Sequence, residues 1–218
     1  MHLIKRLNGR PEDVFANCTL SPSIQEGRLG DWSSLELFEI GQYPWLERYP
    51  YRCNAEARLG ISDEGLMALM YAFEDPIIAR ETRWGGDVYL DSCLELFIMP
   101  FPGESKEDLN IEINPEGVAH VGCGEGREGR YVHRQAVEGM DIHPFRTNGL
   151  WGVSFCMPNS LVIEHFGRPF KPSGLMKGNF YKCSGPLLHE HYGCWNHVGT
   201  EKPDFHRPEY FGDLIIAE

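Results

Sequence analysis

Two short runs of the sequence place carboxylates at alternate positions between apolar residues. Residues 91–98 read DSCLELFI, and residues 109–114 read LNIEIN. Successive side chains of a strand point to opposite faces, so Glu95 and Glu112 should share the outer face of one sheet. The same alternation predicts a set of apolar side chains that point into the core: Leu94, Leu96, Ile98, Ile111 and Ile113.

A turn after the second run should fold residues 118–121 back beside it as a third strand. Residues 114–117 read NPEG, with Asn, Pro and Gly at the positions that a type I turn prefers, so the chain should fold back antiparallel. The resulting meander would display Glu95, Glu112, Asn110 and Asn114 on one face. Neighbouring carboxylates repel, which raises the pKa of one unless donors or a cation satisfy them, and sugar hydroxyls are such donors. The alternative is that Glu95 and Glu112 face solvent or pair with Arg134 or Lys182.

Aromatic side chains could supply the second half of a sugar site. The apolar face of a pyranose packs on a flat ring, while its hydroxyls need polar groups around the rim. Trp84 lies beside Gly85 and Gly86 just before the acidic run, and Phe205 lies in a proline-rich segment near the C-terminus, so we expect both rings at the rim. Three tryptophans beside apolar segments are expected in the core: Trp32, Trp45 and Trp151. The position of Trp195 stays undecided.

The elements that must position these residues are almost all strands. Twenty-four Gly and fifteen Pro separate short runs rich in β-branched and aromatic residues, and the only expected helix is Asn159 to Phe166, which ends at Gly167. Eight or more strands without alternating helices predict an all-β fold, a two-sheet antiparallel sandwich resembling a jelly roll, formed by one domain over residues 1–218. The expected strands are 53–61, 65–74, 92–99, 109–114, 117–122, 150–157, 177–183 and 213–217.

Composition and charge exclude several classes of protein. The net charge is −12 and no cluster of Lys and Arg offsets it, so nucleic acid is not an expected partner. No run of 18 apolar residues occurs, and residues 1–6 (MHLIKR) lack an apolar leader, so we expect a cytoplasmic chain that avoids membranes, or a secreted one if this is a fragment. The seven cysteines form no CxxC pair, and we expect reduced, mostly buried thiols.

Several motifs, taken in order along the chain, resemble family 9-like carbohydrate-binding modules. Residues 91–97 (DSCLELF) followed by 110–117 (NIEINPEG) resemble the central motif of that family. Residues 178–183 (GNFYKC) resemble a late-strand motif, and Trp195 with residues 203–212 (PDFHRPEYFG) resembles a C-terminal signature. The resemblance extends from Trp32 to Leu214.

This resemblance implies a sandwich related to the DOMON fold that binds a mono- or oligosaccharide without cleaving it. The acid of the family's Asp-Ser motif falls on Glu95, and the polar residues of the next strand fall on Glu112 and Asn114. One aromatic wall would be Trp84 or Tyr89, and the other Phe205. Trp195 and His206 complete the binding set that the resemblance implies. Such modules occur attached to glycoside hydrolases such as xylanases, and no cofactor is implied apart from a possible structural calcium, with Asp91 or Asp204 as ligands.

Two other functions stay open. A glycoside hydrolase could use Glu95 and Glu112 as its pair of carboxyl groups, although nothing in the sequence marks either as the buried acid. A haem- or metal-binding DOMON-like domain could use the tail histidines, because His189 and His191 at i and i+2 would share one face of a strand, with His197 and His206 nearby in sequence. Asp91 is the remaining candidate ligand for a metal.

Overall fold

The structure is a computed structural model that describes residues 2–7, 30–133, 140–171, 173–187 and 189–216. Arg134, which the sequence offers as a partner for the carboxylates, and Cys18 lie outside these ranges. Within them, no helix is both long enough and apolar enough to cross a membrane. The elements in chain order are β1 His2–Arg6, η1 Gly30–Ser34, β2 Leu37–Glu39, β3 Asn54–Ile61, β4 Gly65–Phe73, η2 Val88–Leu90, β5 Cys93–Met99, β6 Asp108–Ile113, β7 Ala119–Gly124, β8 Tyr131–Val132, β9 Ile142–Thr147, β10 Leu150–Pro158, α4 Asn159–Phe166, β11 Gly174–Ser184, β12 His191–Cys194, η3 Pro208–Tyr210 and β13 Gly212–Ile216.

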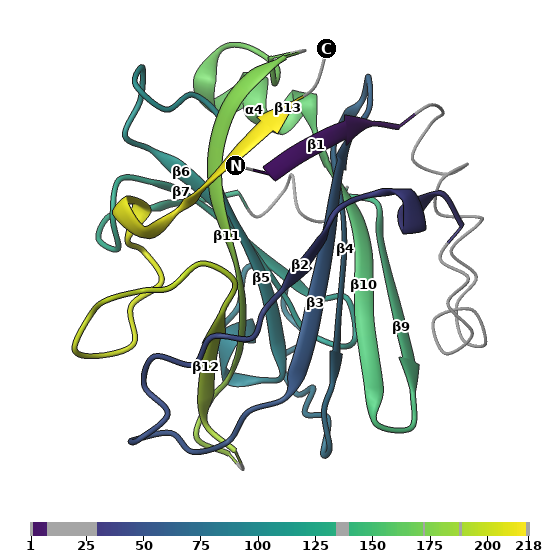
Figure 1. The fold of residues 1–218 in the computed structure, drawn as a ribbon, viewed down its shortest axis with the longest axis vertical. Coiled ribbons are helices and arrows are strands. Elements are labelled where there is room, and N and C mark those ends of the chain that lie inside the picture. The colour runs from purple at the N-terminus through teal and green to yellow at the C-terminus, as the bar shows by residue number, and fades with distance from the viewer. Residues whose placement is uncertain (1, 8–29, 134–139, 172, 188, 217–218) are drawn as a thin grey trace.

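The strands form an all-β sandwich whose two layers are continuous along one edge. The strand order is β8-β7-β6-β5-β11-β13-β1-β3-β4-β10-β9, with β12 paired to β11 and β2 paired to β3. Figure 1 shows β5, β6, β7 and β11 in one layer and β3, β4, β9 and β10 in the other. The predicted two-layer architecture is therefore confirmed, and each predicted strand is present with ends shifted by a few residues.

The first strand joins the two layers. β1 pairs in parallel with β13 of one layer and with β3 of the other, whereas the other strand pairs of the described chain are antiparallel. The sequence predicts an entirely antiparallel sandwich, and the two parallel pairings of β1 correct this prediction. β1, β2, β8, β9 and β12 were not among the predicted strands, because they are short or lie in segments rich in histidine, proline and charge, where alternation is weak.

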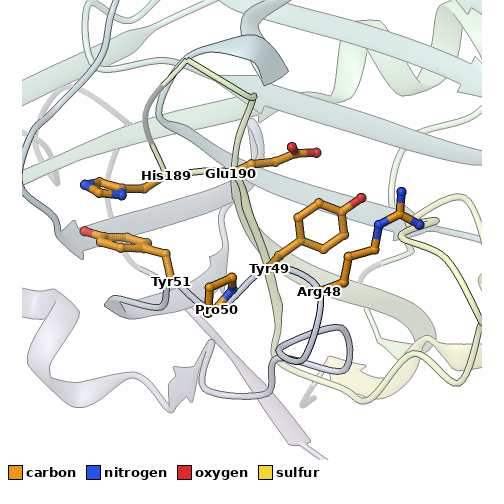
Figure 2. Close-up of a pocket in the computed structure, with 6 residues that line it drawn as sticks. All are labelled: Arg48, Tyr49, Pro50, Tyr51, His189 and Glu190. Atoms are coloured by element: carbon orange, nitrogen blue, oxygen red, sulfur yellow. The ribbon is translucent and has the colours of Figure 1, made fainter.

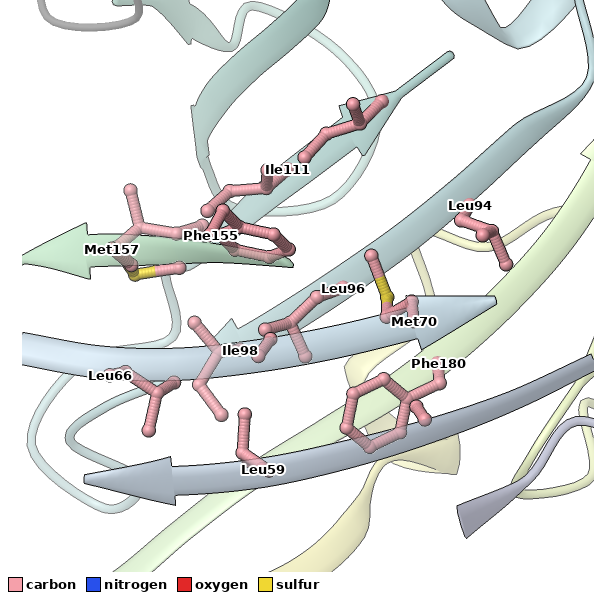
Figure 3. Close-up of a cluster of buried hydrophobic side chains, with 14 of the residues drawn as sticks. Leu59, Leu66, Met70, Leu94, Leu96, Ile98, Ile111, Phe155, Met157 and Phe180 are labelled. Atoms are coloured by element: carbon pink, nitrogen blue, oxygen red, sulfur yellow. The ribbon is translucent and has the colours of Figure 1, made fainter. Parts of the chain in front are cut away.

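The core lies between the two layers. Figure 3 shows Leu94, Leu96 and Ile98 of β5 pointing toward Met70 of β4 and Phe155 of β10. All five of the predicted inward-facing residues are fully buried: Leu94, Leu96, Ile98, Ile111 and Ile113. Trp32 and Trp151 are also fully buried, as predicted. Trp45 is buried in a smaller cluster on the outer side of β11. The helix α4 has the predicted bounds, and Gly167 ends it with a positive φ of 73° that glycine adopts without strain.

One charged pair is buried inside this core. Lys182 of β11 is fully buried, and its Nζ donates to Glu74 Oε1 at 3.2 Å and to the carbonyl of Cys183 at 2.7 Å. The Nε2 of His191 lies 3.1 Å from the same Nζ, and Trp151 Nε1 donates to Glu74 Oε2 at 2.8 Å. Lys182 therefore pairs with Glu74 inside the core and does not reach Glu95 or Glu112 on the outer face.

Candidate functional site

The predicted carboxylate pair lies in the middle of one outer sheet face. Glu95 of β5 is the register partner of Glu112 of β6, so their side chains stand side by side on neighbouring strands. The same row continues to Tyr181 of β11 on one side and to His120 of β7 on the other. The antiparallel pairing of β5 with β6 thus places Glu95 and Glu112 on a common face, and the turn at residues 114–117 leads into β7, which completes the predicted meander.

The C-terminal segment covers part of this face and encloses a cavity of about 450 Å³. A cavity of this size falls within the range of small-molecule sites in proteins. The strands supply its floor, the segment after β12 supplies one wall, and Tyr89 stands at the mouth with 47% of its surface exposed. The lining residues are Tyr89, Glu95, Phe97, Asn110, Glu112, His120, Arg127, Arg130, Val132, Cys183, Tyr192, Pro203, Phe205 and His206.

Burial perturbs the ionisation of both floor carboxylates. The pKa of Glu95 is raised well above its ordinary value, first by burial and then by Cys183 and Glu112. The pKa of Glu112 is also raised by burial, against the opposing influence of His120, Asn110 and the two arginines of the cavity. Cys183 Sγ donates to Glu95 Oε1 at 2.9 Å, and Asn110 Nδ2 donates to Glu112 Oε1 at 2.8 Å. Each of these bonds uses one oxygen of its carboxylate, and both residues line the cavity.

The arginines of the cavity are bonded to other acids. Arg130 Nη2 donates to Asp108 Oδ1 at 2.7 Å in a buried pair, and Arg130 Nε donates to Asn110 Oδ1 at 3.0 Å. Gly122 lies opposite Asn110, and a Cβ there would come within 2.5 Å of Asn110 Oδ1, so glycine leaves room for this bond. Arg127 Nη2 donates to Asp204 Oδ1 at 2.8 Å. Each arginine is therefore held in place beside the carboxylates.

His206 offers a polar atom that protein groups leave unused. Its Nδ1 is buried and has no hydrogen-bond partner within the described part of the chain. Burial, followed by the charges of Arg130 and Arg127, lowers the pKa of His206 to about 3, so the ring is neutral near pH 7. A neutral imidazole can either donate or accept a hydrogen bond, depending on its tautomer. His206 lines the cavity, but its Nδ1 has almost no exposed surface.

We expect the stability of the domain to fall as pH rises through the window set by Glu95. The unfolded carboxyl titrates near 4.5 and the folded one well above it, so between these values the folded state binds more protons and becomes less stable with increasing pH. The pKa values of His191 and His206 are lowered from 6.5 to about 3 in the folded state. Between these two values the unfolded state binds more protons, so these histidines make the domain more stable as pH rises. Chemical denaturation of the native chain and of Glu95→Gln across this pH range isolates the carboxyl contribution. An identical pH slope in the two proteins would contradict it.

Five of the residues expected at the site line the cavity: Tyr89, Glu95, Glu112, Phe205 and His206. Phe205 differs from the expectation in one respect, because it is not an exposed ring at the rim. Only 7% of its surface is exposed, and its ring stacks on that of Tyr181 with centroids 4.0 Å apart. Phe205 is thus a wall of the cavity and also part of a small apolar cluster under the C-terminal segment.

Three expected residues lie away from the cavity. Trp84 is half-buried and packs against the main core. Asn114 is fully buried in the turn before β7, where its amide nitrogen donates to Asp91 Oδ2 at 3.0 Å and its Oδ1 accepts from the backbone of Val118. Trp195 packs edge-on against the ring of Phe38 in the main core. These three residues lie outside the cavity: Asn114 holds the turn, and the two tryptophans pack against the core.

The histidines proposed as a metal pair do not belong to the same strand, because β12 begins at His191. His191 is buried beside Lys182, and burial followed by the charge of Lys182 lowers its pKa to about 3. His189 precedes β12 and is exposed, with its ring stacked on Tyr51 in a second depression of about 500 Å³ (Figure 2). Asp91 Oδ2 accepts from the backbone N–H groups of Arg80 and Glu81 at 2.9 Å, so it braces a loop.

Several residues of the cavity were not identified from the sequence. His120 and Cys183 lie at outward-facing strand positions, so extending the alternation along β7 and β11 could have found them. Arg127, Arg130 and Tyr192 come from segments whose path over the sheet has no periodic signal. Their contribution depends on the loop fold, which local sequence patterns do not encode.

A rigid β-sandwich that carries a polar and aromatic cavity on an outer face is a ligand-binding module. The sequence matches the family model described as Carbohydrate-binding family 9 over residues 26–216. The chain belongs to this family. A search of curated proteins found no significant match.

Solved structures share the fold. A candidate carbohydrate-binding protein from Bacteroides uniformis is 24% identical with a TM-score of 0.79, and the match covers 100% of this chain and 98% of that one. A family 9 module from Caldicellulosiruptor kristjanssonii in complex with cellotriose is 13% identical with a TM-score of 0.62, covering 99% and 92%. A family 9 module from the same organism in complex with glucose is 13% identical with a TM-score of 0.63. That match covers 99% of this chain and 95% of that one.

Proposed function

We propose that this chain binds a mono- or oligosaccharide in the 450 Å³ cavity and does not turn it over. The observation that carries the proposal is the pairing of Glu95 with Glu112 on the floor of a cavity that also contains aromatic walls. Carboxylates accept strong hydrogen bonds from hydroxyls, and a hydroxyl-rich ring would satisfy their free oxygens. Membership of carbohydrate-binding family 9 supports the same function.

The walls suit the apolar face of a sugar. The ring of Tyr89 is exposed at the mouth and can pack on a pyranose, while Phe97, Tyr192 and Phe205 border the cavity from below and from the side. The neutral ring of His206 also borders the cavity. Two solved relatives of the same fold hold cellotriose and glucose, and a site for one glucose-sized unit fits the volume found here.

The arrangement favours binding over hydrolysis. A glycoside hydrolase needs one carboxyl group on each side of the scissile bond. Glu95 and Glu112 instead stand side by side on adjacent strands of one floor, so a sugar would lie over both of them. A chromogenic aryl glycoside should therefore release no chromophore, and release that is lost in Glu95→Gln would identify a hydrolase instead.

We expect Glu95→Ala to weaken sugar binding about 10-fold or more. The substitution removes a carboxyl group from the cavity floor, and a polar group that loses its hydrogen-bond partner on burial costs about 1–3 kcal/mol. The domain should stay folded, because removal of Glu95 also relieves repulsion with Glu112. Calorimetric titration with glucose measures the change, and thermal unfolding checks the fold.

The matched control is Glu116→Ala, which removes an exposed acid from the turn before β7, outside the cavity. Its affinity should equal that of the native chain. Equal binding by Glu95→Ala and the native chain would remove Glu95 from the site.

A further inference from the structure

Three potential metal ligands meet at the floor of the cavity. Cys93 of β5 and Cys183 of β11 are register partners on adjacent strands, and both are buried on the outer face together with Glu95. The two Sγ atoms and a carboxylate oxygen of Glu95 all lie within 4.8 Å of one another. It is the one group of three such ligands found in the described part of the chain.

The spacing suits a tetrahedral ion. Zinc bonds of about 2.3 Å to sulfur and about 2.0–2.2 Å to oxygen separate neighbouring ligand atoms by about 3.5–3.8 Å. Cys183 Sγ is 2.9 Å from Glu95 Oε1, so ion binding requires these two atoms to move apart by roughly 0.6 Å. The thiols of Cys93 and Cys183 also hydrogen-bond to each other. Their contacts with backbone carbonyls are long: Cys183 Sγ to Tyr89 O at 3.7 Å, and Cys93 Sγ to Leu94 O at 3.9 Å. An ion would exchange weak bonds for strong ones.

The charge around the group favours a cation. Glu112 lies directly beside Glu95, and the arginines of the cavity are bonded to Asp108 and Asp204. Lys182, next to Cys183 in sequence, points to the opposite side of the sheet and pairs with Glu74. Two buried carboxylates therefore stand together, and a divalent ion between Glu95 and the thiols would offset their charge.

We propose that Cys93, Cys183 and Glu95 bind a divalent transition-metal ion of the zinc type. Two thiolates with one carboxylate match the preference of zinc for sulfur and oxygen ligands. Glu95 and Cys183 line the cavity, so a fourth coordination position would face the space where a ligand enters. On binding, each thiol loses its proton to the buffer and both sulfurs bind as thiolates. The metal site shares Glu95 with the proposed sugar site, but ion binding is measured without sugar, so the two proposals can fail separately.

The test uses the full chain without a histidine tag, stripped with a chelator and kept reduced with a phosphine. Titration with Co²⁺ should give a sulfur-to-cobalt charge-transfer band that saturates at one ion per chain, and Zn²⁺ should abolish the band. X-ray absorption of the zinc form should show two sulfur neighbours. Cys93→Ser and Cys183→Ser should each weaken Zn²⁺ binding by at least about 10-fold, because loss of even a supporting residue costs about 10- to 100-fold.

Cys156→Ser is the matched control, because Cys156 is also a buried free thiol but lies in a different cluster. It should bind Zn²⁺ as the native chain does. Absence of the charge-transfer band in the native chain, or zinc bound only by nitrogen and oxygen, would overturn the proposal. The same holds if Cys93 and Cys183 form a disulfide that persists under the phosphine. X-ray absorption needs no variant, so the proposal stays testable even if a Cys→Ser chain does not fold. A negative metal result together with intact glucose binding would leave the sugar site in place.

Discussion

Phe205→Ala is expected to lower the free energy of unfolding by about 3 kcal/mol and to abolish measurable sugar binding. Truncation of a buried Phe costs about 3–5 kcal/mol, and one edge of Phe205 borders the cavity, so the lower end of that range applies. The ring stacks on Tyr181 and packs near Trp45 and Tyr192, so its removal also loosens the wall that Tyr192 forms. Urea unfolding and calorimetry with glucose measure the two effects.

Phe205→Leu is the control for this substitution, because it keeps most of the apolar volume. It should cost less than about 1.5 kcal/mol, as volume-conserving exchanges do, and should retain part of the binding. If Phe205→Ala unfolds at the same urea concentration as the native chain, Phe205 is not the packed wall described above.

Lys182→Met should destabilise the domain by about 3–5 kcal/mol. Breaking a buried ion pair leaves an uncompensated charge, here on Glu74, and such losses fall in this range. Burial alone would lower the pKa of Lys182, but Glu74, Cys53 and Cys183 raise it overall, so the lysine is charged in the folded state. Urea unfolding at neutral pH measures the loss.

Two further variants identify the cause. Lys177→Met removes a lysine from the same strand that pairs with Asp213 at the surface, and it should change stability by less than about 1 kcal/mol. The double variant Lys182→Met with Glu74→Gln removes both buried charges and should be more stable than Lys182→Met alone. A double variant no better than the single one would show that packing, and not the unpaired charge, causes the loss.

The parts of this molecule that follow from local periodicity were predictable. Alternation in residues 91–98 and 109–114 identified both faces of β5 and β6, and Asn, Pro and Gly in the turn at residues 114–117 gave the antiparallel return from β6 to β7. The carboxylate pair on the cavity floor is a direct consequence. A strand has a period of two, so a single correct assignment places each of its side chains.

The parts that depend on long-range packing were not predictable. The parallel pairing of β1 with both layers brings residues 2–6 beside residues 212–216 and 60–61, and no local pattern encodes that contact. Trp84 and Trp195 are of a residue type that often binds sugars, but both pack against the core. The sequence does not show which surface a loop covers, so their positions could not be predicted. Asn114 was assigned to the outer face, whereas the turn that it begins uses its side chain.

Sugar binding in this cavity is tested most directly by a calorimetric titration of the native chain and of Tyr89→Ala with glucose and cellotriose. The native chain should bind with a dissociation constant of roughly micromolar to millimolar, the range expected for a small polar ligand in an open cavity. Tyr89 is 47% exposed, so its removal should leave the fold intact and weaken binding by about 10-fold through loss of ring stacking. Absence of heat with both sugars, or equal affinity of the two proteins, would contradict a sugar site in this cavity.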